Sequence, residues 1–245
     1  MNSGIDGALA IMIIGSFLAA MVLHETGHAL TSFCFSRGGQ GIDKRSLHLR
    51  PRLDVMGTIF CILLAFQPLF PVGLGWGKPL RDDTWMMQRV PRTSRSIVAL
   101  AGPLLNFIIG LLVALIMRFA GPYLLGFDTL FAQRLLQIML VFASVNICLA
   151  IFNMIPLYPL DGYQIVRSLL PGRAAAAFTK SAFFGLVFVL VLFFVLPFMA
   201  QLTGGSSIPL FRLPSYVLSE SFHLIAAMIG PFPTNFDLVR GLYFS

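Results

Sequence analysis

The chain has 245 residues, of which 57% are hydrophobic and only 11% are charged. Its mean hydropathy of +0.85 is higher than the surface of a water-soluble domain of this length tolerates, which excludes an ordinary soluble protein. The net charge of +7 comes from basic residues in connecting segments rather than on one soluble face, which argues against nucleic-acid binding. The composition therefore predicts an integral membrane protein.

Four stretches reach or approach the roughly 20 apolar residues that cross a bilayer as a helix. They are Gly7–Phe35, Ser96–Met117, Leu135–Leu157 and Ser181–Ala200. The first stretch has no Lys or Arg before it, so it is interpreted as a retained span rather than a secretory signal. The three cysteines share no CxxC spacing and lie in or beside apolar runs, which favours buried thiols over disulfides or metal ligands.

The segment between the first two spans, residues 36–95, carries ten Lys and Arg residues against four aspartates. Positive charge concentrates in cytoplasmic loops, so this segment is predicted to be cytoplasmic and the N-terminus to lie outside. Within it, Met56–Trp76 is apolar but rich in Pro and Gly and flanked by basic residues on both sides, which favours a re-entrant segment over a full crossing. Leu47, Leu49 and Leu53 alternate with polar residues, which predicts either a small β-hairpin or an extended basic linker.

The C-terminal part shows no linker or composition shift that would mark a second domain. We therefore expect a single membrane-embedded domain with a core at about residues 7–170, a span at 181–200 and a tail at 201–245. The apolar piece Phe222–Pro231 in the tail is too short to cross a bilayer, so an interfacial helix is predicted there. The predicted fold class is an all-α polytopic membrane protein.

The pentad His24-Glu25-Thr26-Gly27-His28 lies inside the first apolar span, where ionisable side chains are costly unless something compensates them. Positions four apart share a helix face, so the two histidines can offer imidazole nitrogens to one metal ion. Glu25 can flank that ion without binding it, at a place suited to accept a proton from water. The pattern predicts a zinc site with Glu25 as general base.

A hydrolytic zinc usually takes three protein ligands and keeps a fourth position for water. The only other glutamate is Glu220, and most aspartates lie in loops or termini, whereas Asp161 follows the third predicted span directly. If Met56–Trp76 is re-entrant, the first and third spans run parallel and Asp161 can meet the histidines at similar depth. Pro156 and Pro159 disfavour helix before them, so the chain can turn Asp161 inward.

Two amides in apolar spans, Asn153 and Asn106, are expensive to bury without partners. Asn153 is a possible donor to a substrate carbonyl or its oxyanion. Asn106 is interpreted as a second residue that orients substrate or supports a ligand. For both, a hydrogen bond between helices is the structural alternative.

Taken together, His24-Glu25-Thr26-Gly27-His28, Gly102-Pro103-Leu104-Leu105-Asn106 and the pattern Asn153-x-x-Pro156-x-x-Pro159-Leu160-Asp161-Gly162 resemble the site-2 protease family of intramembrane zinc metalloproteases. Gly75-Trp76-Gly77-Lys78-Pro79 looks like a segment of its compact members. The resemblance covers roughly residues 17–170. It implies a core of three transmembrane helices, Zn²⁺ held by His24, His28 and Asp161, and Asn153 engaging substrate.

The expected function is that of a zinc metalloendopeptidase that cleaves membrane-spanning protein substrates within the bilayer, with a bacterial plasma membrane as the expected location. Many family members carry a PDZ or CBS domain, for which this chain has no room, so a gating or adaptor protein in trans is a possible partner. One alternative is a non-proteolytic zinc-binding or zinc-transport protein that uses the same ligands. Another is a membrane zincin whose third ligand is Glu220.

Overall fold

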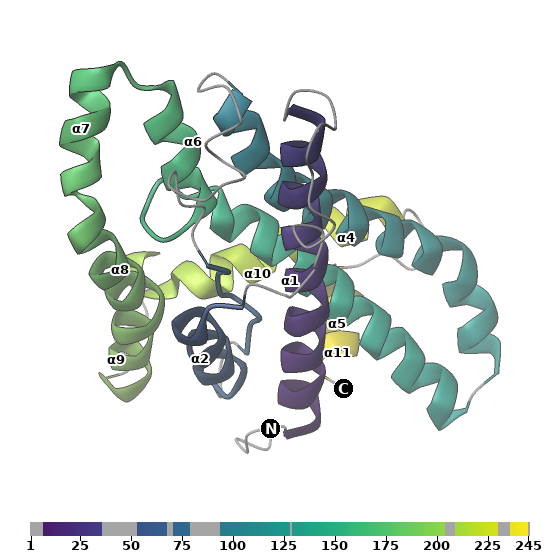
Figure 1. Ribbon diagram of the computed structural model, residues 1–245. Coiled ribbons are helices and arrows are strands. Elements are labelled where there is room, and N and C mark those ends of the chain that lie inside the picture. The colour runs from purple at the N-terminus through teal and green to yellow at the C-terminus, as the bar shows by residue number, and fades with distance from the viewer. Residues whose placement is uncertain are drawn as a thin grey trace.

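The computed structural model describes residues 7–35, 53–67, 71–78, 94–127, 129–203, 209–229 and 236–244, and Figure 1 shows their arrangement. These residues are almost entirely helical. The elements in chain order are α1 (Gly7–Phe35), α2 (Val55–Ala65), α4 (Arg95–Gly126), α5 (Leu130–Asn153), α6 (Asp161–Leu169), α7 (Gly172–Lys180), α8 (Ala182–Leu190), η4 (Val191–Val195), α9 (Leu196–Thr203), η5 (Pro209–Arg212), α10 (Leu213–Ile229) and α11 (Phe236–Tyr243).

Four of the described helices are long and apolar enough to cross a membrane, as the sequence predicts. They are α1, most of α4 (Arg95–Leu124), α5, and the continuous run of α8, η4 and α9 from Ala182 to Thr203. The third span ends at Asn153 rather than at the predicted Leu157. Pro156 accounts for the difference, because proline disfavours helical backbone in the residue before it and cannot donate to the helix.

The core lies where α1, α4 and α5 pack against one another, each touching the other two. Fully buried apolar side chains from α1 and α5 fill this core, among them Phe17, Met21, Leu140 and Leu149. Removing that much apolar surface from lipid brings no hydrophobic gain, so close van der Waals packing must supply the stability. Gly27 allows this closeness, since a Cβ there would lie 2.6 Å from the Ala101 carbonyl oxygen of α4.

The segment from Leu53 to Gly77 begins and ends at the same place, because these two residues form an antiparallel bridge. Its helix, α2, has only 11 residues, and the described residues 71–78 return without helix or strand, apart from the bridge at Gly77. Asp54 holds both ends together: its carboxylate accepts hydrogen bonds from the Gly57 backbone N–H at 3.1 Å and from Trp76 Nε1 at 2.9 Å. A re-entrant segment has ends that meet in this way, and the re-entrant interpretation of Met56–Trp76 stays a prediction.

The predicted β-hairpin is not supported by the part of the chain that the structure describes, which contains no strand. Leu47 and Leu49 lie outside the described residues, and Leu53 forms a single isolated bridge. The pairing stops after Leu53 because Asp54 caps the N-terminus of α2 and the chain is helical from Val55 onward.

The C-terminal helices α10 and α11 pack against helices of the core. The apolar piece predicted at Phe222–Pro231 belongs to the longer helix α10, which packs against α4 and α5 and buries Leu218, Phe222 and Ile225. On α11, the fully buried Tyr243 donates a hydrogen bond from its hydroxyl to the Pro71 carbonyl at 3.2 Å. The end of α11 is thereby joined to the start of the returning segment.

Candidate zinc centre

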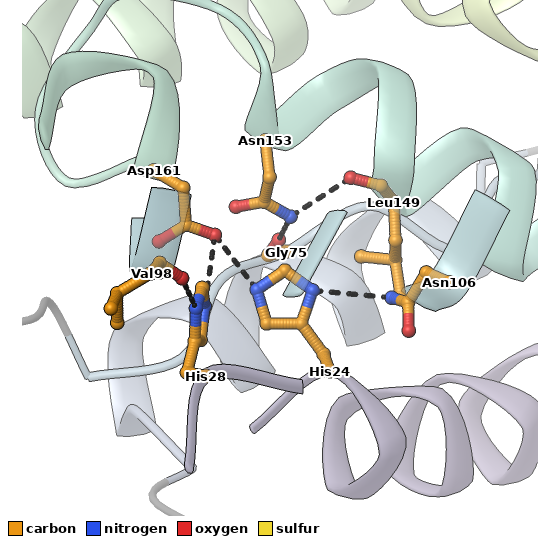
Figure 2. Close-up of polar contacts among 8 residues, drawn as sticks. All are labelled: His24, His28, Gly75, Val98, Asn106, Leu149, Asn153 and Asp161. Atoms are coloured by element: carbon orange, nitrogen blue, oxygen red, sulfur yellow. Dashed lines mark hydrogen bonds and ion pairs between the residues drawn. The ribbon is translucent and has the colours of Figure 1, made fainter. Parts of the chain in front are cut away.

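Helix α1 places His24 and His28 on one face, with the ring centroids 4.7 Å apart. Both rings are buried, at 2% and 3% exposure, and both Nε2 atoms point to the same carboxylate. His24 Nε2 lies 2.8 Å and His28 Nε2 lies 3.3 Å from Asp161 Oδ2. Figure 2 marks both contacts with dashed lines. The i,i+4 spacing predicted from the pentad therefore gives two convergent nitrogens.

Asp161 reaches the histidines across 137 residues of sequence because the chain unwinds after α5. Residues 154–160 form turns, and α6 begins at Asp161 itself. Gly162 is needed in this turn, since a Cβ there would collide with the carbonyl oxygens of Met154 and Ile155. The prolines and Gly162 thus explain why Asp161 faces the core.

The fourth span supports this turn from the other side. A Cβ at Gly185 of α8 would lie 2.7 Å from the Tyr158 carbonyl oxygen, so α8 passes directly over the turn. Further along the span, Phe193 of η4 packs edge-on against Phe152 of α5, next to Asn153, with 5.0 Å between the ring centroids. The span at 182–203 therefore packs against the end of α5 and against the turn that leads to Asp161.

The three side chains fit a zinc ion. One ligand atom from each of His24, His28 and Asp161 lies within 4.8 Å of the others, and this is the one such group within the described residues. Burial favours a protonated Asp161, but the two histidine rings outweigh it and hold the pKa of this carboxyl well below its usual range. Two imidazoles and one ionised carboxylate form a hydrolytic zinc ligand set.

Helix α4 supplies the layer behind the histidines. Val98, Gly102 and Asn106 are four residues apart and so share one face of the helix. The Val98 carbonyl oxygen lies 2.7 Å from His28 Nδ1, and Asn106 Nδ2 lies 3.3 Å from His24 Nδ1. Sequence reasoning missed Val98, because a backbone carbonyl leaves no signal in the residue type.

Gly102 lies between these two contacts, and we expect Gly102→Ala to disrupt the site. A Cβ at this position would lie 2.7 Å from His24 Nε2 and closer still to His28 Nε2, so the rings must move. Overpacking of this kind costs about 1–3 kcal/mol, which should appear as weaker zinc retention in a chelator titration. Gly121→Ala on the same helix is the matched control, since no atom lies within 4 Å of its Cβ position. Equal zinc retention in both variants would contradict this reading.

The other predicted site residues lie nearby. Glu25 is half-buried on α1 and interacts electrostatically with His28. Asn153 is buried, and its amide nitrogen donates to the Leu149 carbonyl at 3.0 Å and to the Gly75 carbonyl at 3.4 Å. Asn153 therefore ties α5 to the non-helical returning segment, rather than to another helix as the structural alternative had it. Its predicted role in substrate binding stays a prediction.

Comparison with known proteins agrees with this geometry. The sequence profile of peptidase family M50 matches residues 119–196, which include Asp161. YwhC of Bacillus subtilis, named as a candidate zinc metalloprotease, is 32% identical over 188 residues, which cover 76% of this chain and 79% of YwhC. This chain belongs to peptidase family M50. It is a zinc metalloprotease of the site-2 protease type, as the sequence motifs predict.

Two further relatives of this M50 peptidase carry the same description. Rip2 of Mycobacterium tuberculosis, also named as a candidate zinc metalloprotease, is 30% identical over 189 residues, covering 75% of this chain and 66% of Rip2. Zinc metalloprotease MJ0392 of Methanocaldococcus jannaschii is 28% identical over 170 residues, covering 69% of this chain and 37% of the archaeal protein. No solved structure matches the chain.

Proposed function

We propose that this M50 peptidase cleaves membrane-spanning protein substrates inside the bilayer, at zinc held by His24, His28 and Asp161. The observation that carries the proposal is the buried His24–His28–Asp161 group, whose histidines lie within an apolar helix of membrane-spanning length. A water-soluble peptide has no ready route to such a site, whereas a substrate helix in the membrane can approach it laterally. The expected products therefore have new termini within an apolar stretch.

The proposed chemistry is hydrolysis of one peptide bond. Bound zinc supplies a Lewis acid that acidifies a water molecule and polarises the substrate carbonyl. Glu25 accepts a proton from the attacking water as the water oxygen bonds to the carbonyl carbon. The same Glu25 then delivers that proton to the leaving nitrogen as the C–N bond breaks, which yields one carboxylic acid group, with the second proton of the water, and one amine. Asp161 and the two histidines hold the ion throughout.

The proposed topology keeps the N-terminus outside and residues 36–95 on the cytoplasmic side. The pairing of Leu53 with Gly77 supports it, because a segment whose ends meet leaves the membrane on the side where it entered. The returning residues 71–78 then lie at membrane depth, where irregular backbone needs cover from protein. Residues 71–76 have that cover, since all six are buried.

The alternative of a zinc transporter needs further polar residues along a path through both faces. Within the described part of the chain no second group of possible metal ligands accompanies the first. The Glu220 alternative also lacks support, since the group of convergent ligands contains Asp161 and not Glu220.

Metal removal tests the proposal. Purified protein in detergent or liposomes, incubated with a model transmembrane substrate, should lose cleavage when a strong zinc chelator is added and regain it with stoichiometric Zn²⁺. Mg²⁺, which prefers oxygen ligands, should not restore cleavage. Mass spectrometry of the products locates the cut. Cleavage by metal-free protein, or a cut confined to the water-exposed flanks of the substrate, would contradict the proposal.

A further inference from the structure

The two histidines have different hydrogen-bond partners behind them, although both point Nε2 at Asp161. His28 Nδ1 lies 2.7 Å from the Val98 carbonyl oxygen. A carbonyl oxygen can only accept, so His28 carries a proton on Nδ1, and a neutral His28 has its lone pair on Nε2. The Val98 carbonyl thus favours, for a neutral His28, the tautomer that binds a metal ion through Nε2.

His24 is in the opposite situation. Its Nδ1 lies 3.3 Å from Asn106 Nδ2, and an amide nitrogen can only donate. In this orientation Nδ1 accepts, so a neutral His24 carries its proton on Nε2 and donates it to Asp161 Oδ2 at 2.8 Å. A protonated Nε2 has no lone pair for zinc. The ligand role of His24 therefore requires an acceptor at the position of the amide nitrogen.

Asn106 can supply that acceptor by turning its amide through about 180°. The side chain is fully buried, and Oδ1 has no hydrogen-bond partner in the described residues. The only polar contact of the amide nitrogen seen here is with His24. Oxygen and nitrogen of an amide have nearly the same shape, and their assignment follows the hydrogen bonds they make. His24 therefore decides the orientation of this amide.

We propose that Asn106 is a positioning residue that sets the tautomer of His24 by presenting Oδ1 to a proton on Nδ1 when zinc is bound. The inference rests on the proposed function, because it requires zinc on His24 Nε2. It assigns Asn106 an action on the ligand itself rather than on substrate. Helix α4 then fixes both histidines from one face, through the Val98 carbonyl for His28 and through Asn106 for His24.

The test uses two substitutions of nearly equal shape. Asn106→Asp keeps an acceptor and loses the donor, whereas Asn106→Leu loses both. Zinc affinity of each purified full-length variant is measured by competition with a fluorescent zinc chelator. Loss of an outer partner of a zinc-bound histidine typically costs roughly 10- to 100-fold in affinity, so Asn106→Leu should bind that much more weakly. Asn106→Asp should bind about as tightly as wild type.

The outcomes separate this inference from the proposed function. Wild type that fails to bind zinc near 1:1 would overturn both. Wild type that binds, with Asn106→Leu equally tight, would overturn only the role of Asn106. Equal weakening of both variants would show a donor or packing role and would also overturn it. If Asn106→Leu does not fold, the comparison of Asn106→Asp with wild type decides, and a tenfold or greater loss there contradicts the proposal.

Discussion

Replacing Glu25 with glutamine should reduce cleavage of a model transmembrane substrate by roughly 100- to 10,000-fold, the usual contribution of a general acid–base group. Glutamine has nearly the shape of glutamate but cannot take a proton from water. Because Glu25 is not one of the three convergent ligands, the variant should keep its zinc. The rate constant from single-turnover cleavage, measured beside the zinc content of the same sample, checks both parts.

The matched control for Glu25→Gln is Glu220→Gln, which removes the only other glutamate in the chain. Glu220 lies on α10, outside the convergent ligand group. This variant should cleave at the wild-type rate. Cleavage retained by Glu25→Gln at full zinc occupancy would remove Glu25 from the mechanism.

Replacing Asp161 with alanine should abolish cleavage by removing the zinc itself. Asp161 contacts both histidines, so its loss leaves two buried imidazoles with no carboxylate to complete the site. The fall in zinc affinity should exceed the roughly 10- to 100-fold that loss of an outer partner causes. Chelator competition on the purified variant measures it.

Asp54→Asn is a suitable comparison for Asp161→Ala. Asp54 is also a carboxylate with a structural hydrogen bond, to Trp76 Nε1, but among the residues that the structure describes it belongs to no group of possible metal ligands. Its replacement should leave the zinc affinity near that of wild type. Similar losses in both variants would indicate general destabilisation rather than loss of a ligand.

The convergence of the three possible zinc ligands could be predicted from the sequence because most of its signals are local. The spacing of His24 and His28 fixes a shared helix face, and the chain offers few carboxylates from which to choose a third ligand. The prolines after Asn153 indicated where the helix would unwind. The predicted end of the span was wrong by four residues, since α5 ends at Asn153 and not at Leu157.

The layer behind the ligands could not be predicted, because it depends on how two helices align. Asn106 was recognised as an unusual buried amide, but its contact with His24 follows from the register of α4 against α1. The Val98 carbonyl is invisible in a sequence for a simpler reason, since every residue carries the same group. The close approach at Gly102 likewise appears only once the helices are placed.

In the C-terminal tail, hydropathy located a helix but not its full length. Hydropathy alone marked Phe222–Pro231 as a short apolar piece, whereas α10 begins at Leu213 and includes Ser, Glu and His residues. Polar residues that interrupt an apolar run lower its hydropathy without ending the helix. The predicted interfacial position of this tail remains a prediction.

The most direct test of the whole account is the zinc-to-protein ratio, measured by inductively coupled plasma mass spectrometry on wild type and on His24→Ala, His28→Ala, Asp161→Ala and Glu220→Gln. The zinc-to-protein ratio should be near one for wild type and Glu220→Gln, and near zero for the other three variants. Full zinc in Asp161→Ala, or loss of zinc in Glu220→Gln, would contradict it.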